Sequence, residues 1–105
     1  MRETKMIELE DAVMEIIVNA GQSRSLCFEA LHAARAGNFD EAKQLLREAD
    51  GYSRQAHHMQ TKLIEQDAGE ARQPMTLIMV HAQDHLMTSM LARELAEEII
   101  HLYQR

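Results

Sequence analysis

The chain has 105 residues, of which 46% are hydrophobic but only 4% aromatic, with one proline, four glycines and no tryptophan. This composition fits long helices around an aliphatic core and disfavours a β-sandwich, which needs aromatic and β-branched runs between frequent turns. The length predicts a single domain over residues 1–105. The net charge of −6 disfavours nucleic-acid binding through a basic patch.

A cytoplasmic location without membrane insertion is expected. The single cysteine, Cys27, cannot form a disulfide within the chain, which favours a reducing compartment. Residues 1–8 lack the apolar core of a signal peptide, and every apolar run is far shorter than the ~18 residues of a membrane span. Cys27 itself is predicted to be a small buried hydrophobe rather than a reactive thiol.

The first predicted helix covers residues 9–36 and ends at Gly37. Gly21 interrupts it, at a cost of about 1 kcal/mol relative to alanine, and indicates a kink or a close helix contact rather than a break. Apolar and small residues recur at alternating steps of three and four, which predicts one buried stripe. Its members are Leu9, Val13, Ile16, Ala20, Ser23, Cys27, Ala30 and Ala34.

The second predicted helix covers residues 38–67, with Asn38 as a cap and Glu41 completing a capping box. Gly69 supplies its C-terminal stop. Alanines recur every seven residues and would allow another helix to approach closely. The predicted stripe is Ala42, Leu45, Ala49, Ser53, Ala56, Gln60 and Leu63.

The third predicted helix covers residues 75–103, just after Pro74, which is tolerated in a first helical turn. Three long helices with short connections predict an all-α fold, an antiparallel three-helix bundle. A heptad-like seam along the third helix should be buried or interfacial. We expect Met79, Met87 and Met90 to lie in the core, or Met87 or Met90 to form an adaptable apolar rim around His81. The seam is Leu77, His81, Asp84, Thr88, Leu91, Leu95 and Leu102.

Polar residues gather in and beside this seam, and each needs a partner if it is buried. His81, Gln83, Asp84 and His85 fall within five residues. In the simplest interpretation, His81 and His85 are core or interface histidines whose hydrogen bonds are satisfied by Asp84. Alternatively, the HxxxH pair binds zinc, with His57 or His58 as a further ligand, although the general base of an HExxH protease is missing. A third interpretation is nucleophilic catalysis by a neutral imidazole.

A resemblance favours the third interpretation. Residues 80–91 (VHAQDHLMTSML) resemble the signature of the lactose/cellobiose family of enzyme IIA, from the bacterial phosphoenolpyruvate-dependent sugar phosphotransferase system. The similarity covers nearly the whole chain, and the HAQDH sequence looks most like the chitobiose/cellobiose members. Further matching segments are 19–25 (NAGQSRS), 37–39 (GNF), 56–57 (AH), 60–65 (QTKLIE) and 67–70 (DAGE).

The resemblance implies roles for four residues. His81 matches the histidine that accepts a phosphoryl group from the histidine phosphocarrier protein and passes it to a cysteine of enzyme IIB, during uptake of a β-linked disaccharide. Gln83 and His85 match groups that line the phosphoryl pocket. Asp84 matches a carboxylate that meets its two copies at the axis of a homotrimer of nine helices, where a divalent cation binds.

Physical arguments agree with these roles. Three converging carboxylates cannot all stay ionised without a counter-charge, and Mg²⁺ is the natural cation for oxygen ligands and water. The transferred phosphoryl group needs hydrogen-bond donors, for which Gln83, His85 and Thr88 are candidates. A non-catalytic helical adaptor, a zinc-binding bundle and a two-component phosphotransfer domain remain as rivals.

Overall fold

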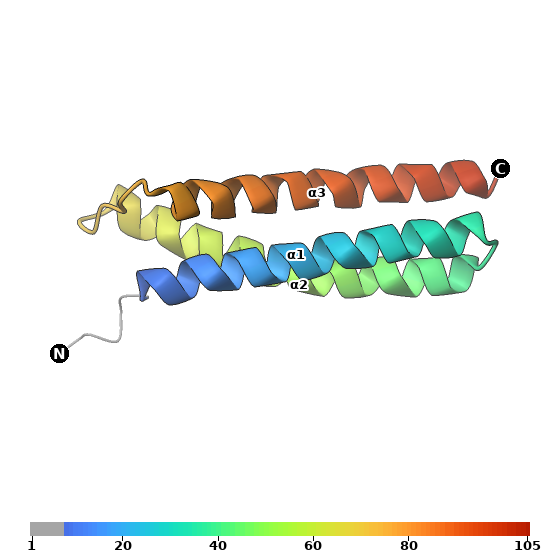
Figure 1. Cartoon of the computed structure of the whole chain (residues 1–105), viewed down its shortest axis with the longest axis horizontal. Helices are drawn as coiled ribbons and strands as arrows, with labels where there is room; N and C mark the ends of the chain where they lie inside the picture. The colour runs from blue at the N-terminus through green and yellow to red at the C-terminus, as the bar shows by residue number, and fades with distance from the viewer. Residues whose placement is uncertain (1–7) are drawn as a thin grey trace.

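The computed structural model describes residues 8–105 and contains three α-helices, α1 (Leu9–Arg35), α2 (Phe39–Ala68) and α3 (Leu77–Tyr103). The chain runs up, down and up again, so that α1 and α3 are parallel and α2 is antiparallel to both (Figure 1). The predicted antiparallel three-helix bundle is confirmed, and the predicted helix ends differ from the observed ones by at most two residues. Within residues 8–105, no helix combines the length and the apolar character needed to cross a membrane.

The turn between α1 and α2 is formed by Gly37, whose φ of +86° suits glycine. The amide of Asn38 donates to the carbonyl of Ala33 and the amide of Gly37 donates to that of Ala34, which is a Schellman motif. The predicted capping box is wrong, because the Asn38 side chain makes no capping hydrogen bond. The Schellman bonds already order this turn through the backbone.

The start of α3 is set by Thr76, whose hydroxyl oxygen accepts a hydrogen bond from the Met79 amide at 3.2 Å. This side chain satisfies one of the free N–H groups of the first turn. The helix therefore begins at Leu77, two residues later than predicted, and Pro74 lies in the preceding loop.

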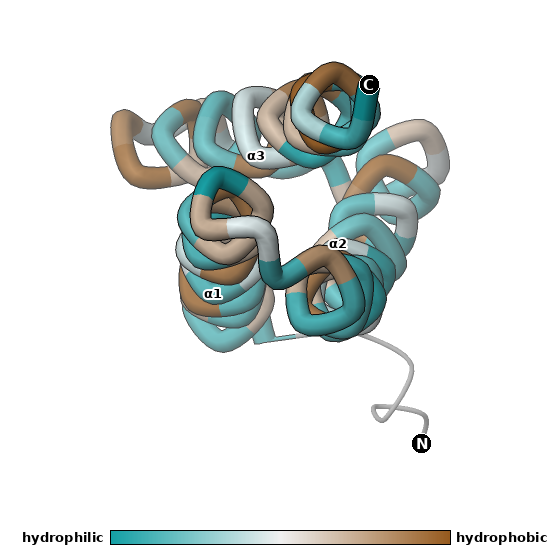
Figure 2. The backbone as a smooth tube through the Cα atoms, turned by 90° about the vertical axis from the view of Figure 1, so that its right-hand side faces the viewer, coloured by the Kyte–Doolittle hydropathy of each residue, from teal (hydrophilic) through white to brown (hydrophobic). Residues whose placement is uncertain are grey.

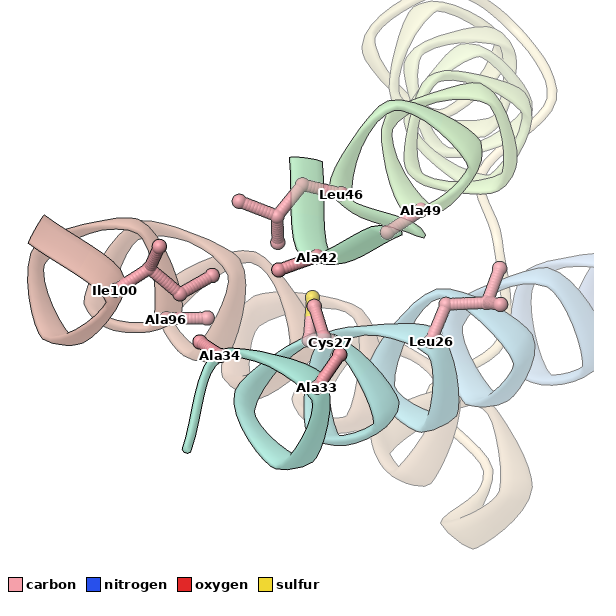
Figure 3. Close-up of a cluster of buried hydrophobic side chains, with 10 residues drawn as sticks. Leu26, Cys27, Ala33, Ala34, Ala42, Leu46, Ala49, Ala96 and Ile100 are labelled. Atoms are coloured by element: carbon pink, nitrogen blue, oxygen red, sulfur yellow. The ribbon is translucent and has the colours of Figure 1, made fainter. Parts of the chain in front are cut away.

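Figure 2 views the bundle nearly along its length, with the three helices side by side. The buried hydrophobic residues form two clusters, each with members from all three helices. One cluster joins the C-terminal half of α1 to the start of α2 and the end of α3, and Cys27 lies among its side chains (Figure 3). The second cluster joins the other halves of the helices. Ala42, Ala49 and Ala56 are each 0% exposed, so the predicted alanine repeat does bring helices close together.

The predicted stripes of α1 and α2 are confirmed, apart from three residues that are only partly buried, Leu9, Leu45 and Ser53. Cys27 is buried, as predicted, and burial raises the pKa of its thiol above the ordinary value. Since the thiolate is the reactive form, the raised pKa makes this cysteine unreactive.

An ion pair bridges α2 and α3 between the two core clusters. Arg93 donates to both carboxylate oxygens of Asp50, at 2.6 and 3.1 Å, and to Glu97 at 2.9 Å. The hydrogen bond to Asp50 is the main cause that raises the pKa of Arg93 above its ordinary value. Because α2 and α3 make the least extensive helix contact of the bundle, this bidentate bridge is important for their packing.

We expect Asp50→Asn to lower the free energy of unfolding by about 2 kcal/mol, between the values for exposed and buried pairs, because the Arg93 and Asp50 side chains are only 20% and 35% exposed. The matched control is Glu97→Gln, which removes the more exposed partner of the same arginine and should cost under about 0.5 kcal/mol. Urea denaturation measures both. Equal losses would contradict the importance of the bridge to α2.

Candidate functional site

The rotation of α3 about its own axis decides where the candidate residues point. Its buried side chains form a stripe that faces α1 and α2: Met79, Ala82, Leu86, Ser89, Ala96 and Ile100. The predicted seam is a different stripe, and its residues are exposed on the outer side of the chain. Within residues 8–105, His81 and Asp84 are therefore surface residues, and their interpretation as core residues is wrong. Their interpretation as interface residues stays a prediction.

The exposed seam is mainly apolar. Leu77 is 85% exposed, Leu91 54%, Leu95 51% and Leu102 59%. Exposed leucines gathered on one face of a helix indicate a candidate interaction surface. Met87, predicted to be in the core, is also exposed at 46%, because the buried stripe passes through Leu86 instead. Met79 is buried, as predicted, and Met90 packs partly against the core.

The imidazole rings of His81 and His85 are stacked one helical turn apart. Their centroids are 5.7 Å apart and their planes differ by 9°, which is an offset-stacked arrangement. His81 is exposed and His85 is half-buried. The outer ring can therefore be reached by a partner, while the inner ring packs against it from the direction of α1.

His85 lies at the edge of an open pocket on α1, of about 500 Å³. Three residues of α1 that line this pocket can donate hydrogen bonds to an anion, namely Arg24, Ser25 and His32. The pocket is also lined by Glu29, which is negatively charged. The Arg24 guanidinium lies 5.9 Å from the centroid of the Phe28 ring. This surface offers donors close to the inner imidazole.

Gln83 faces α2 rather than the stacked histidines. At 3.6 residues per turn it lies about 200° around the helix from His81. Its carboxamide oxygen accepts a hydrogen bond from Gln60 Nε2 at 2.6 Å, and its nitrogen is 3.5 Å from the sulfur of Met79. Within the described chain, Gln83 thus lines a different pocket from that of His85. Its role in a phosphoryl pocket stays a prediction.

The Thr88 hydroxyl is occupied by its own helix. It donates to the carbonyls of Asp84 and His85, at 3.0 and 3.1 Å. A hydroxyl has one hydrogen to donate, so Thr88 is poorly suited to the role that the sequence suggested, which is to donate a hydrogen bond to the phosphoryl oxygens. His85 remains the candidate hydrogen-bond donor next to His81.

A metal site within one chain is not formed by the predicted ligands. Among residues 8–105, no three His, Cys, Asp or Glu side chains are grouped so that they could hold an ion. A zinc site from His81, His85 and either His57 or His58 is thus not present within the chain. Asp84 supplies one exposed carboxylate, so it could take part in a cation site only with ligands from other copies or from water.

Two contacts escaped the sequence analysis. Gln60 was predicted as a core position but not as the partner of Gln83. Gly21 was expected to make a close helix contact, and that contact is with the His85 ring, since a Cβ at Gly21 would lie 3.3 Å from His85 Nε2. A glycine within a strong helical pattern indicated a close contact at Gly21, but the sequence could not show that His85 makes this contact.

The chain is similar to proteins of a known family. A family described as "PTS system, Lactose/Cellobiose specific IIA subunit" matches residues 11–104. The N,N'-diacetylchitobiose-specific EIIA component of Escherichia coli is 50% identical over 103 residues, which cover 98% of this chain and 89% of that protein.

Two solved structures have the same fold. The PTS cellobiose-specific enzyme IIA from Bacillus anthracis has a TM-score of 0.90 and 37% identity, over 94% of this chain and 91% of that one. The IIA(chitobiose)–HPr complex of Escherichia coli has a TM-score of 0.81 and 50% identity, over 94% and 96%.

The Gln60–Gln83 contact can be tested by a double-mutant cycle. Gln60→Leu or Gln83→Leu alone should cost about 1–3 kcal/mol of unfolding free energy, because each leaves a shielded amide without its partner. The double variant should recover much of that loss. Additive losses in urea denaturation would contradict a direct contact.

Proposed function

Since the chain belongs to the family of lactose/cellobiose-specific IIA subunits, which are components of a phosphotransferase system, we propose that it carries a phosphoryl group on His81. The group comes from the histidine phosphocarrier protein, HPr, and goes to a cysteine of enzyme IIB. The relatives named for chitobiose and cellobiose support a β-linked disaccharide of that class as the transported sugar. The IIA protein itself contacts other proteins rather than the sugar.

The accessible, stacked imidazole of His81 is the observation that carries this proposal. A ring nitrogen with a free lone pair attacks the phosphorus atom, and the bond from phosphorus to the donor's histidine nitrogen breaks. The donor imidazole takes up the proton that His81 gives up. In the second step, the thiolate of enzyme IIB attacks the same phosphorus and the bond to His81 breaks, while the His81 ring takes up the proton that the thiol gave up. The exposed position lets the two partners reach His81 in turn.

Side chains near His81 could stabilise the negative charge of the transferred phosphoryl group. His85 stacks on the reacting ring, and the surface beside it carries Arg24 and His32. Donors held in place stabilise the charge that is spread over the phosphoryl oxygens. The similarity to a IIA protein solved together with HPr supports HPr as the first partner.

We also propose that three copies assemble through the exposed apolar seam of α3. The leucines of the seam would be buried, and Asp84, which lies among them, would meet its two copies. A hard divalent cation such as Mg²⁺ suits carboxylate oxygens and water, and bound there it would supply the positive charge that three close carboxylates require. The chemistry of the donor set fits such an ion.

Replacing His81 by alanine should abolish phosphoryl acceptance and leave the fold intact, because the side chain is exposed. Intact mass after incubation with phosphoenolpyruvate, enzyme I and HPr should reveal one acid-labile adduct on the parent and none on His81→Ala. His101→Ala, an exposed histidine at the end of the same helix, is the matched control and should accept the group normally. An adduct on His81→Ala would refute the assignment.

Replacing Asp84 by leucine should remove the bound cation and keep the trimer, since an apolar axis can replace a cluster of buried charges and add about 1–4 kcal/mol of stability. Light scattering and metal analysis measure the two effects separately. Leu91→Lys, on the same seam, should instead weaken the trimer. A monomeric Asp84→Leu protein, a cation retained by it, or a fully trimeric Leu91→Lys protein would each contradict the proposed assembly.

A further inference from the structure

Two glycines lie inside helices, and their surroundings differ. At Gly51, in α2, a Cβ would meet nothing within 4 Å. At Gly21, in α1, a Cβ would stand 3.3 Å from His85 Nε2, so close that the imidazole would have to move by a few tenths of an ångström. Glycine is a poor helix former. The missing side chain at Gly21 therefore has a local use, which is to make room for this ring.

The His85 ring connects α1 to His81. It meets Gly21 on one side and stacks on the His81 ring, with centroids 5.7 Å apart and planes within 9° of parallel. His85 is half-buried, whereas His81 is exposed on the outer face of α3. A displacement of the inner ring would therefore change the surface on which the outer ring stacks.

We propose that Gly21 is a positioning residue for phosphoryl transfer. It leaves space on α1 for the His85 ring, and the face of that ring holds the His81 imidazole in its reactive orientation. This inference rests on the proposed function of His81. It assigns to α1 a part in orienting the reactive ring, in addition to the charged side chains that α1 presents beside His85.

The chemistry explains why such a support is needed. An exposed side chain loses rotamer freedom when it is held in one orientation, and transfer requires the attacking nitrogen to lie in line with the bond that breaks. Positioning errors well below the size of an atom reduce rates strongly, by about 100-fold for 1 Å. A shift of a few tenths of an ångström should therefore slow transfer without blocking it.

The test compares Gly21→Ala with Gly51→Ala in the full chain. Both replace glycine by alanine inside a helix, so both should keep or raise the thermal midpoint. Only Gly21→Ala should slow acceptance from phosphorylated HPr, by about three- to tenfold, as followed by intact mass over time. A normal rate in Gly21→Ala, or an equal slowing in Gly51→Ala, would overturn the proposal.

A double-mutant cycle with His85→Asn tests the route. Asparagine lacks an atom at the Nε2 position, so Gly21→Ala should cause no further slowing in the His85→Asn background. The same fold-loss in both backgrounds would mean that Gly21 acts by another path and would overturn the proposal.

A spectroscopic readout separates this inference from the proposed function. The ring-proton NMR shifts of His81 and His85 should change in Gly21→Ala and stay unchanged in Gly51→Ala, with no phosphoryl donor present. If the parent accepts no phosphoryl group, the proposed function fails, and these spectra alone decide whether Gly21 positions the rings. Unchanged ring shifts in Gly21→Ala would overturn the positioning.

Discussion

The burial of one stripe of α3 is the constraint on which the rest of the structure depends. Met79, Ala82, Leu86 and Ile100 are each at most 3% exposed, and their packing fixes the rotation of the helix. Every other α3 side chain then has a determined direction. His81 faces outward because it lies outside this stripe. Gln83 lies about 200° around the helix from His81, which directs it towards α2. A rotation of α3 would expose these buried side chains and bury polar ones in their place. The protein would then lose the free energy gained by burying apolar surface.

The three helix contacts of the bundle are stabilised differently. Small residues such as Ala20, Ala42 and Ala49, all 0% exposed, let helices approach closely and gain dispersion energy over a narrow core. The contact between α2 and α3 is less extensive and includes two polar bridges, from Arg93 to Asp50 and from Gln60 to Gln83. These directional contacts define the register of α3 against α2, which apolar packing alone would define less sharply.

The carrier role proposed for His81 makes two opposing demands on its side chain. The imidazole must be exposed, because two partner proteins would reach it in turn, and it must be oriented, because phosphoryl transfer needs an aligned nucleophile. In this chain the exposure comes from the outer face of α3 and the orientation from the stack on His85, which rests against α1. The exposed apolar side chains of α3 would be buried if copies of the chain associated. Such association would add buried apolar surface that a chain of this size cannot obtain by folding alone.

The sequence by itself determined the helix count, the approximate ends of the helices and the buried stripes of α1 and α2, because periodicity and glycine positions are local signals. It also identified residues 80–91 as the chemically unusual segment, through polar groups in an apolar pattern and a family resemblance. The tertiary structure decided which of two apolar stripes on α3 enters the core of the chain, since both have helical spacing and only the fit to α1 and α2 separates them. It likewise decided that Gln83 pairs with Gln60, that Arg93 pairs with Asp50 and that Gly21 meets His85. Such contacts join residues far apart along the chain, and they exist only once the packing has set the rotation of each helix.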